Sequence, residues 1–360
     1  MDKFCVFCGE KPEQKNAEHI MPKWLIELTG NPKRKAYFGY QHEIMPHPQL
    51  RTFSFDAFKF PSCASCNQKY SGLEAATKSI IEKMLVSDSL SATDINILLD
   101  WFDKVRVGLW LGFQYLDKNR AGITPKFYIE KRIGLNDRML AIFKADTDTM
   151  GLNYIGCELP SFTYTPSCFS IRINNLCFLN MSYNDLFSRR IGFPYPIESF
   201  ATPEQQQLGI FTSGRNRVMV PLLKKNFTIK GTEIYQPMFR YRISDAKARE
   251  FFDTQYVRDN SMVWEEGIGK IFIQDNDKLR EYPVSPSKEY VPNASYELAE
   301  LLFKIQIQTL EWQSYVDSLA PSLRNLSPQE KRGLFDQRMW VKKFNRELIQ
   351  VLLDKARGLQ

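Results

Sequence analysis

Three observations predict an α+β protein built from several domains. Two Cys-x-x-Cys pairs near the N-terminus are the pattern of a small module held together by a metal ion. Short alternating apolar runs, separated by turn residues, fill the middle of the chain and indicate strands. Apolar residues at helical spacing dominate the C-terminal part. We therefore expect a metal-stapled module over 1–90, a mainly β mixed domain over 91–290 and a helical region over 291–360.

The cysteine pattern predicts a structural zinc site. Two Cys-x-x-Cys pairs can close a tetrahedral all-thiolate site, and the ligands would be Cys5, Cys8, Cys63 and Cys66. Because 54 residues separate Cys8 from Cys63, a further element must fold between the pairs. The total of seven cysteines is odd and no charged-then-apolar leader opens the chain, which disfavours a disulfide framework. The alternative is four ordinary buried thiols.

A second group of residues has the chemistry of a hydrolytic site. Glu18 and His19 lie between the cysteine pairs, and Asn67 follows the second pair. A neutral imidazole can accept a proton near pH 7, and a carboxylate with an amide oxygen can hold a hard divalent cation. Alternatively, Glu18 is a surface carboxylate and Asn67 caps the helix that it opens. Glu74, two turns beyond Asn67, is either an accessory ligand or a solvated helix residue. The sequence has only three histidines: His19, His42 and His47. The last two are expected to be loop residues.

The motifs Cys-x-x-Cys, Glu-His-Ile-x-Pro and Cys-x-x-Cys-Asn, in this order, resemble the HNH endonuclease family over about the first 75 to 90 residues. The resemblance implies a zinc-stapled, treble-clef-like ββα-metal fold and hydrolysis of phosphodiester bonds in nucleic acid. It further implies that His19 is the general base and that Glu18 and Asn67 bind one catalytic Mg²⁺ or Mn²⁺ ion. The middle Asn of the family is missing, and Asp56 or a backbone carbonyl is expected to replace it.

Several functional interpretations stay open. The resemblance favours DNA over RNA as substrate and a role in bacterial defence or restriction. One alternative is an RNA endonuclease, acting for example on tRNA. Another is a non-catalytic zinc module that binds nucleic acid or a partner protein, which the missing Asn favours. The net charge of +7 is mild, and residues 1–100 hold 12 basic and 12 acidic side chains, so additional phosphate contacts are expected from later regions or from a partner.

Helix signals flank the predicted β region. A long helix is expected over 93–117, where Ser91 and Asp94 form a capping box, and it should pack on the helix that carries Asn67. A second helix is expected over 294–319. Ser327, followed by a first-turn proline and a glutamate, predicts the start of a last helix that runs to about residue 358. This last helix packs within the molecule, binds a partner or faces nucleic acid.

The middle region is expected to contain strands over 168–173, 176–181, 217–221, 226–230 and 270–274. Its basic pairs, Arg189-Arg190 and Lys224-Lys225, are either solvated surface or phosphate contacts. No apolar run approaches the roughly 20 residues of a membrane span, so we expect a cytoplasmic protein that does not contact a membrane. Since one site cuts one strand, the C-terminal region is expected to mediate a homodimer or contact with a partner protein.

Overall fold

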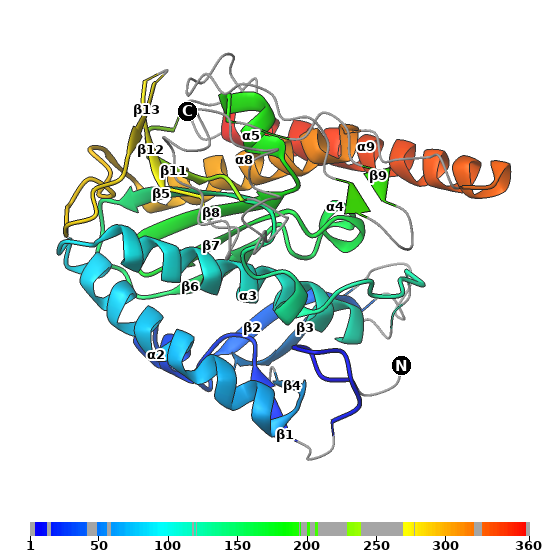
Figure 1. Ribbon diagram of the computed structural model, residues 1–360, viewed down its shortest axis with the longest axis horizontal. Helices are drawn as coiled ribbons and strands as arrows, with labels where there is room; N and C mark the ends of the chain where they lie inside the picture. Colours follow the sequence, from blue (N-terminus) through cyan, green and yellow to red (C-terminus); the bar gives the residue numbers. More distant parts are fainter. Residues whose placement is uncertain are drawn as a thin grey trace.

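The structure is a computed structural model of the 360-residue chain. It describes residues 4–12, 16–41, 49–55, 59–116, 119, 121–193, 195, 200–201, 206–207, 229–238, 269–276, 278–319 and 326–357. A mixed sheet lies between two layers of helices, and the N-terminal elements lie against the outer side of one layer (Figure 1). The α+β class predicted from the sequence is confirmed.

The N-terminal region contains two small antiparallel sheets and two helices. Its elements are β1 (Asn16–His19), α1 (Lys23–Leu28), β2 (Lys35–Gln41), β3 (Gln49–Ser54), β4 (Lys59–Ser62) and α2 (Ala64–Leu85). Strand β1 pairs with β4, and β2 pairs with β3. Helix α1 begins directly after its N-cap Pro22 and is part of the further element expected between the cysteine pairs. Helix α2 begins earlier than expected, because Cys63 is its N-cap; the idea that Asn67 caps and opens this helix is therefore wrong.

Helix α3 (Ala92–Leu116) is the central element of the molecule. Its predicted capping box is confirmed: the Ser91 N–H donates to Asp94 Oδ2 at 2.8 Å, and the Asp94 N–H donates to Ser91 Oγ at 3.2 Å. Most of its residues are buried, because α3 packs on α2 on one side and on the main sheet on the other. The sequence predicted the contact with α2 correctly.

The main sheet has the strand order β13-β12-β11-β5-β8-β7-β6, and β14 runs parallel to the end of β5. The other neighbours are antiparallel. The strands are β5 (Asp137–Ala145), β6 (Leu152–Ile155), β7 (Cys168–Ile173), β8 (Leu176–Tyr183), β11 (Thr232–Gln236), β12 (Phe272–Asp275), β13 (Lys278–Glu281) and β14 (Ser295–Tyr296). Short elements complete the middle region: 3-10 helix η2 (Ile129–Lys131), α4 (Pro160–Tyr164), α5 (Leu186–Ile191) and the pair β9 (Phe200–Ala201) and β10 (Gln206–Gln207).

Both faces of this sheet are buried. On the central strand β5, Leu140 and Ile142 face the core shared with α3, whereas Met139, Ala141 and Phe143 face the core shared with α8. Side chains alternate between the faces of a strand, so a strand covered on both sides is apolar at nearly every position. The predicted strands β7 and β8 are confirmed, and the predicted strand at 270–274 is present as β12. The predicted strand at 217–221 and most of that at 226–230 lie outside the described residues.

Two long helices form the C-terminal region. Helix α8 (Leu298–Ser318) covers one face of the sheet, and α9 (Pro328–Arg357) packs on α8 and extends beyond the body of the molecule (Figure 1). The Ser327 N–H donates to Glu330 Oε2 at 2.8 Å, so the predicted start of α9 is confirmed. Of the three roles expected for this helix, packing within the molecule is confirmed for its buried side, which includes Val341, Asn345 and Leu352.

A buried polar network joins α3 to the sheet. The fully buried Arg138 of β5 donates to Asp100 Oδ1 at 2.5 Å and to Asp103 Oδ2 at 3.2 Å. Asp103 also accepts from Arg106 at 2.5 Å, and Arg106 donates to Asn180 of β8. Each buried charge therefore has an opposite charge beside it, as burial demands. One apolar core is continuous from the cysteine region through α3 to the sheet.

Candidate metal centre and its surroundings

Four cysteines from two distant segments come together at the N-terminal end of α2. The ligand atoms of Cys5, Cys8, Cys63 and Cys66 all lie within 4.8 Å of one another. The Sγ atoms of Cys8 and Cys63 are 3.9 Å apart, close to the roughly 3.8 Å that separates two thiolates around one tetrahedral zinc ion. All seven cysteines are free. A cluster of four soft thiolate donors fits zinc, so the four cysteines predicted to bind a metal ion are positioned to do so.

The first cysteine pair has a tight turn that requires a glycine. Gly9 has φ +86° and donates its N–H to the Cys5 carbonyl at 2.9 Å. A Cβ atom at this position would lie 2.2 Å from the ring of Tyr128. The Val6 N–H donates to the Pro61 carbonyl at 3.1 Å and ties the first pair to β4, directly before the second pair. The backbone thus holds the two segments together.

The electrostatics of the cluster call for a cation. Burial, followed by the neighbouring Cys5 and Cys8, raises the pKa of Cys63 to about 11, and the pKa of Cys66 is raised for the same reasons. Burial alone would raise the pKa of Cys5, but backbone N–H groups, including that of Cys63 at 3.3 Å, lower it. Four thiolates at this separation repel one another, and a dication among them converts that repulsion into attraction.

Glu18 lies inside the protein beside a lysine that sequence reasoning missed. Lys104 of α3, 2% exposed, donates to Glu18 Oε1 at 2.8 Å and to Glu74 Oε1 at 2.5 Å. Burial lowers the pKa of Lys104, but Glu74 and then Glu18 outweigh it, and the pKa is raised above its ordinary value. Lys104 is therefore an ammonium ion that already neutralises the carboxylate expected to bind the divalent cation.

Glu74 belongs to the same ion cluster. Its second oxygen, Oε2, accepts from the indole N–H groups of Trp24 at 3.1 Å and Trp101 at 3.2 Å. These contacts account for both oxygens, so the description of Glu74 as a solvated helix residue is wrong. A sequence signal for Lys104 existed, because it is a single lysine on the long and mostly apolar helix α3.

His19 and Asn67 lie away from that cluster. Neighbouring strand residues point to opposite faces, so the half-buried His19 shares the outer face of the β1–β4 ribbon with its cross-strand partner Lys59, opposite to buried Glu18. Asn67 is half-buried in the first turn of α2, and its N–H donates to the Cys63 carbonyl at 3.0 Å. It precedes Glu74 by seven residues, about 10 Å along the helix axis. The structure brings Glu18 and Glu74 together. Asp56, His42 and His47 lie outside the described residues.

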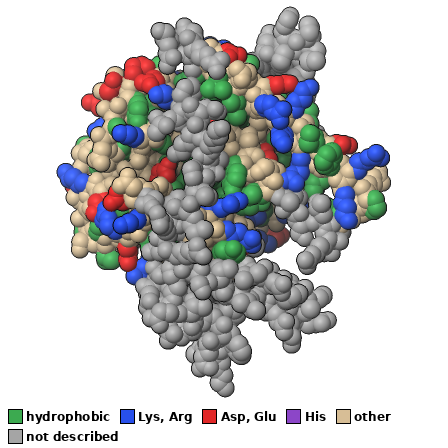
Figure 2. Space-filling view, turned by 90° about the horizontal axis from the view of Figure 1, so that it is seen from above, with side chains coloured by type: hydrophobic (Ala, Val, Ile, Leu, Met, Phe, Trp, Pro, Cys, Tyr) green, Lys and Arg blue, Asp and Glu red, His purple; other side chains and the backbone are tan. Residues whose placement is uncertain are grey.

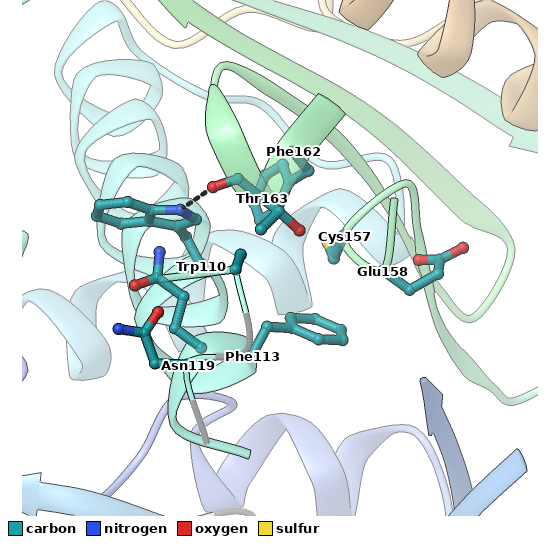
Figure 3. A pocket seen from close by; sticks show the side chains of 9 residues that line it. Trp110, Phe113, Asn119, Cys157, Glu158, Phe162 and Thr163 are labelled. Carbon is teal, nitrogen blue, oxygen red and sulfur yellow. Dashed lines mark hydrogen bonds between the residues drawn. The ribbon is translucent and has the colours of Figure 1, made fainter. Parts of the chain in front are cut away.

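Two hollows lie near these elements. A groove of about 280 Å³ runs along the β1–β4 ribbon, and its lining includes Lys11, Asn16, Lys59 and Tyr115 but no acidic residue. The second is a cavity of about 30 Å³ between α3 and α4, which has room for one water molecule (Figure 3). There the Trp110 indole donates to the Thr163 carbonyl at 2.8 Å, and the Glu158 carboxylate points away from the other labelled side chains.

Within the described part of the chain, the four cysteines are the one group of three or more His, Cys, Asp or Glu residues arranged to hold a metal ion. No described helix is both long enough and apolar enough to cross a membrane. Of the predicted basic pairs, Arg189-Arg190 lies exposed on α5, and Lys224-Lys225 lies outside the described residues. Comparison with family models, with curated proteins and with solved structures found no match to this chain.

Proposed function

We propose that this chain is an HNH-type endonuclease that hydrolyses phosphodiester bonds, with DNA favoured as its substrate. The observation that carries the proposal is the four-cysteine cluster, formed by two Cys-x-x-Cys pairs that bracket His19. The succession of β1, its antiparallel partner β4 and then α2 supports a ββα unit around that cluster. Zinc held by the cysteines would have a structural role, because four thiolates leave no open coordination position.

His19 is the proposed general base. It accepts a proton from the water that attacks phosphorus, and its place on the outer face of the ribbon leaves it on the side from which a polyanion can approach. Lys59, its cross-strand partner, and Lys11 line the adjacent groove and give that face a positive charge. These cations attract the phosphate backbone and bring a phosphodiester to the imidazole.

A divalent ion on Glu18 and Asn67 stays a prediction. When bound, it would neutralise charge on the phosphoryl oxygens and on the departing oxygen. To bind the ion, the Glu18 carboxylate would have to give up its contact with Lys104. The proposed proton transfer depends on His19 alone.

Cleavage assays test this proposal. The full chain is incubated with supercoiled plasmid, single-stranded DNA and RNA in Mg²⁺ or Mn²⁺, beside His19→Ala and the control Lys23→Ala, which alters an exposed residue of α1. We expect wild type and control to cleave and His19→Ala to lose at least about 100-fold, the usual contribution of a general base. Equal cleavage by His19→Ala removes the proposed base. RNA cleavage without DNA cleavage supports the RNA alternative.

A second function is favoured by the Lys104 contacts. Because Glu18 and Glu74 both contact the ammonium group of Lys104, each carboxylate already has a cationic partner inside the protein, as in a structural unit that holds no catalytic metal. In that case the chain is a non-catalytic zinc protein that binds nucleic acid or a partner. Binding of nucleic acid by the wild type, without cleavage in either metal ion, would support it.

A further inference from the structure

Helix α9 has an outer side that nothing in the described structure covers. Its inner side packs on α8, yet Phe335 is 63% exposed and Met339 is 49% exposed. The first half of the helix projects from the body (Figure 1), and blue and green side chains lie next to each other on the projecting end (Figure 2). Large exposed apolar side chains in a group mark a contact surface more often than scattered ones do.

The exposed residues are arranged by charge. At 100° per residue, four cations and two apolar residues fall within a sector of about 100°. We call this sector the basic stripe: Lys331, Arg332, Phe335, Met339, Lys342 and Arg346. All six side chains are exposed. The acidic residues of the helix lie outside the sector, so the stripe has a net charge of four.

The stripe is not neutralised within the described structure. Elsewhere on α9, Lys343 pairs with Glu347 at 3.9 Å, the ordinary way in which a surface helix balances its charge. None of the four cations of the basic stripe forms an ion pair with a described residue. Such a stripe attracts a polyanion, because four uncompensated cations repel one another until an anionic partner lies among them.

We propose that the basic stripe binds the phosphate backbone of nucleic acid. Its cations extend over about 22 Å of helix, long enough to meet several successive phosphates, while Phe335 and Met339 offer apolar contact to sugars or unpaired bases. The choice of nucleic acid as the polyanion rests on the proposed function. A membrane fits less well, because an interfacial helix needs a wide continuous apolar face, and Phe344, Leu348 and Leu352 of α9 pack against α8 instead.

Binding of a fluorescein-labelled 20-base-pair duplex and of a single strand, followed by anisotropy in EDTA from 50 to 200 mM salt, tests the proposal. The full chain is compared with Lys342→Gln/Arg346→Gln and with the control Lys278→Gln/Lys288→Gln. The control removes two exposed cations at and beside β13, at the end of the molecule away from the projection of α9. Four phosphate contacts give a salt slope of about −3.6 in the logarithm of affinity, so the stripe variant should lower its magnitude by about 1.8.

We expect at least about 10-fold weaker binding for the stripe variant at 100 mM salt and less than 2-fold for the control. Equal affinity of the two variants, or no binding by the wild type, overturns the proposal. Two further outcomes also overturn it. In the first, the wild type binds vesicles with anionic lipid but not nucleic acid. In the second, the stripe variant keeps its affinity for nucleic acid but sediments differently from the wild type, which would make a second copy of the chain the partner of the stripe. Stripe-dependent binding without cleavage would reject the proposed enzyme but keep this site.

Discussion

Replacing Lys104 by methionine is the sharpest test of the internal charge arrangement. Methionine keeps most of the length of the side chain and removes its charge. Two carboxylates, 11% and 15% exposed, would then face each other without a cation. Breaking a buried ion pair in this way costs about 3–5 kcal/mol of the free energy of unfolding, because one charge stays buried and uncompensated. Here two do.

The loss of unfolding free energy in Lys104→Met should depend on pH. Without Lys104, the folded state favours protonated Glu18 and Glu74, so the variant binds more protons folded than unfolded and gains stability as pH falls. In the wild type, the raised pKa of Lys104 contributes stability that is fully present below the unfolded value of about 10.4 and is lost as pH rises through the folded value. The difference in the free energy of unfolding between wild type and Lys104→Met should therefore be largest near pH 7–8 and become smaller towards pH 5.

Urea unfolding at pH 5 and pH 7.5 measures both effects. Lys69→Met is the matched control, because Lys69 pairs with Glu130 at the surface, where the two side chains are 58% and 41% exposed. An exposed pair contributes about 0–1 kcal/mol. If Lys104→Met loses no more than this control at pH 7.5, the ion cluster is not the stabilising unit described above, and Glu18 is free to serve another ligand.

Three more predictions follow from the site and the sheet. Cys63→Ser should lose the roughly one zinc ion per chain that we expect by elemental analysis, whereas Cys177→Ala, buried in the sheet, should keep it. Gly9→Ala should lower the melting temperature sharply, because its Cβ meets a tyrosine ring at 2.2 Å, whereas Gly72→Ala in α2, with nothing within 4 Å, should raise it slightly. Burial and then Asp185 raise the pKa of Asp137 to about 7, so the folded state holds a proton that the unfolded state releases above about pH 4. The free energy of unfolding should therefore fall as pH rises from 4 to 7, and it should fall less in Asp137→Asn.

Each of these three predictions would be contradicted by a specific result. Zinc retained by a folded Cys63→Ser protein would reject the four-thiolate site. Equal melting temperatures for the two glycine variants would show that the turn tolerates a side chain. An unchanged pH profile in Asp137→Asn would assign the slope to other carboxylates.

The sequence predicted local features well where neighbouring residues decide them. The capping boxes at Ser91 and Ser327 depend on bonds that span three residues, so the pattern itself contains both partners. The cysteine pairs behave similarly, because their spacing fixes the two halves of the cluster. Only the contact between the two cysteine pairs depends on the fold of the intervening chain.

Features that depend on distant contacts were missed. The central strand β5 was not predicted, because it is buried on both faces and reads as a continuous apolar run without the alternation of a half-buried strand. The contact between Lys104 and Glu18 joins residues 86 positions apart, and no local pattern pairs them. The alternative that Asn67 is a helix cap is wrong, because Cys63, a residue type with no strong capping preference, is the N-cap of α2.

Helix α3 contributes to both halves of the molecule at once: Lys104 meets the carboxylates of β1 and α2, while Arg106, two positions later, meets Asn180 of the sheet. A piece of the chain cut near residue 90 would retain every thiolate of the cluster but lose Lys104 and Trp101, so that Trp24 alone would still donate to Glu74. Transplanting the N-terminal region into another protein, or exchanging it between relatives by recombination, must therefore carry this helix along. The N-terminal region and the sheet therefore share α3 as a common structural element.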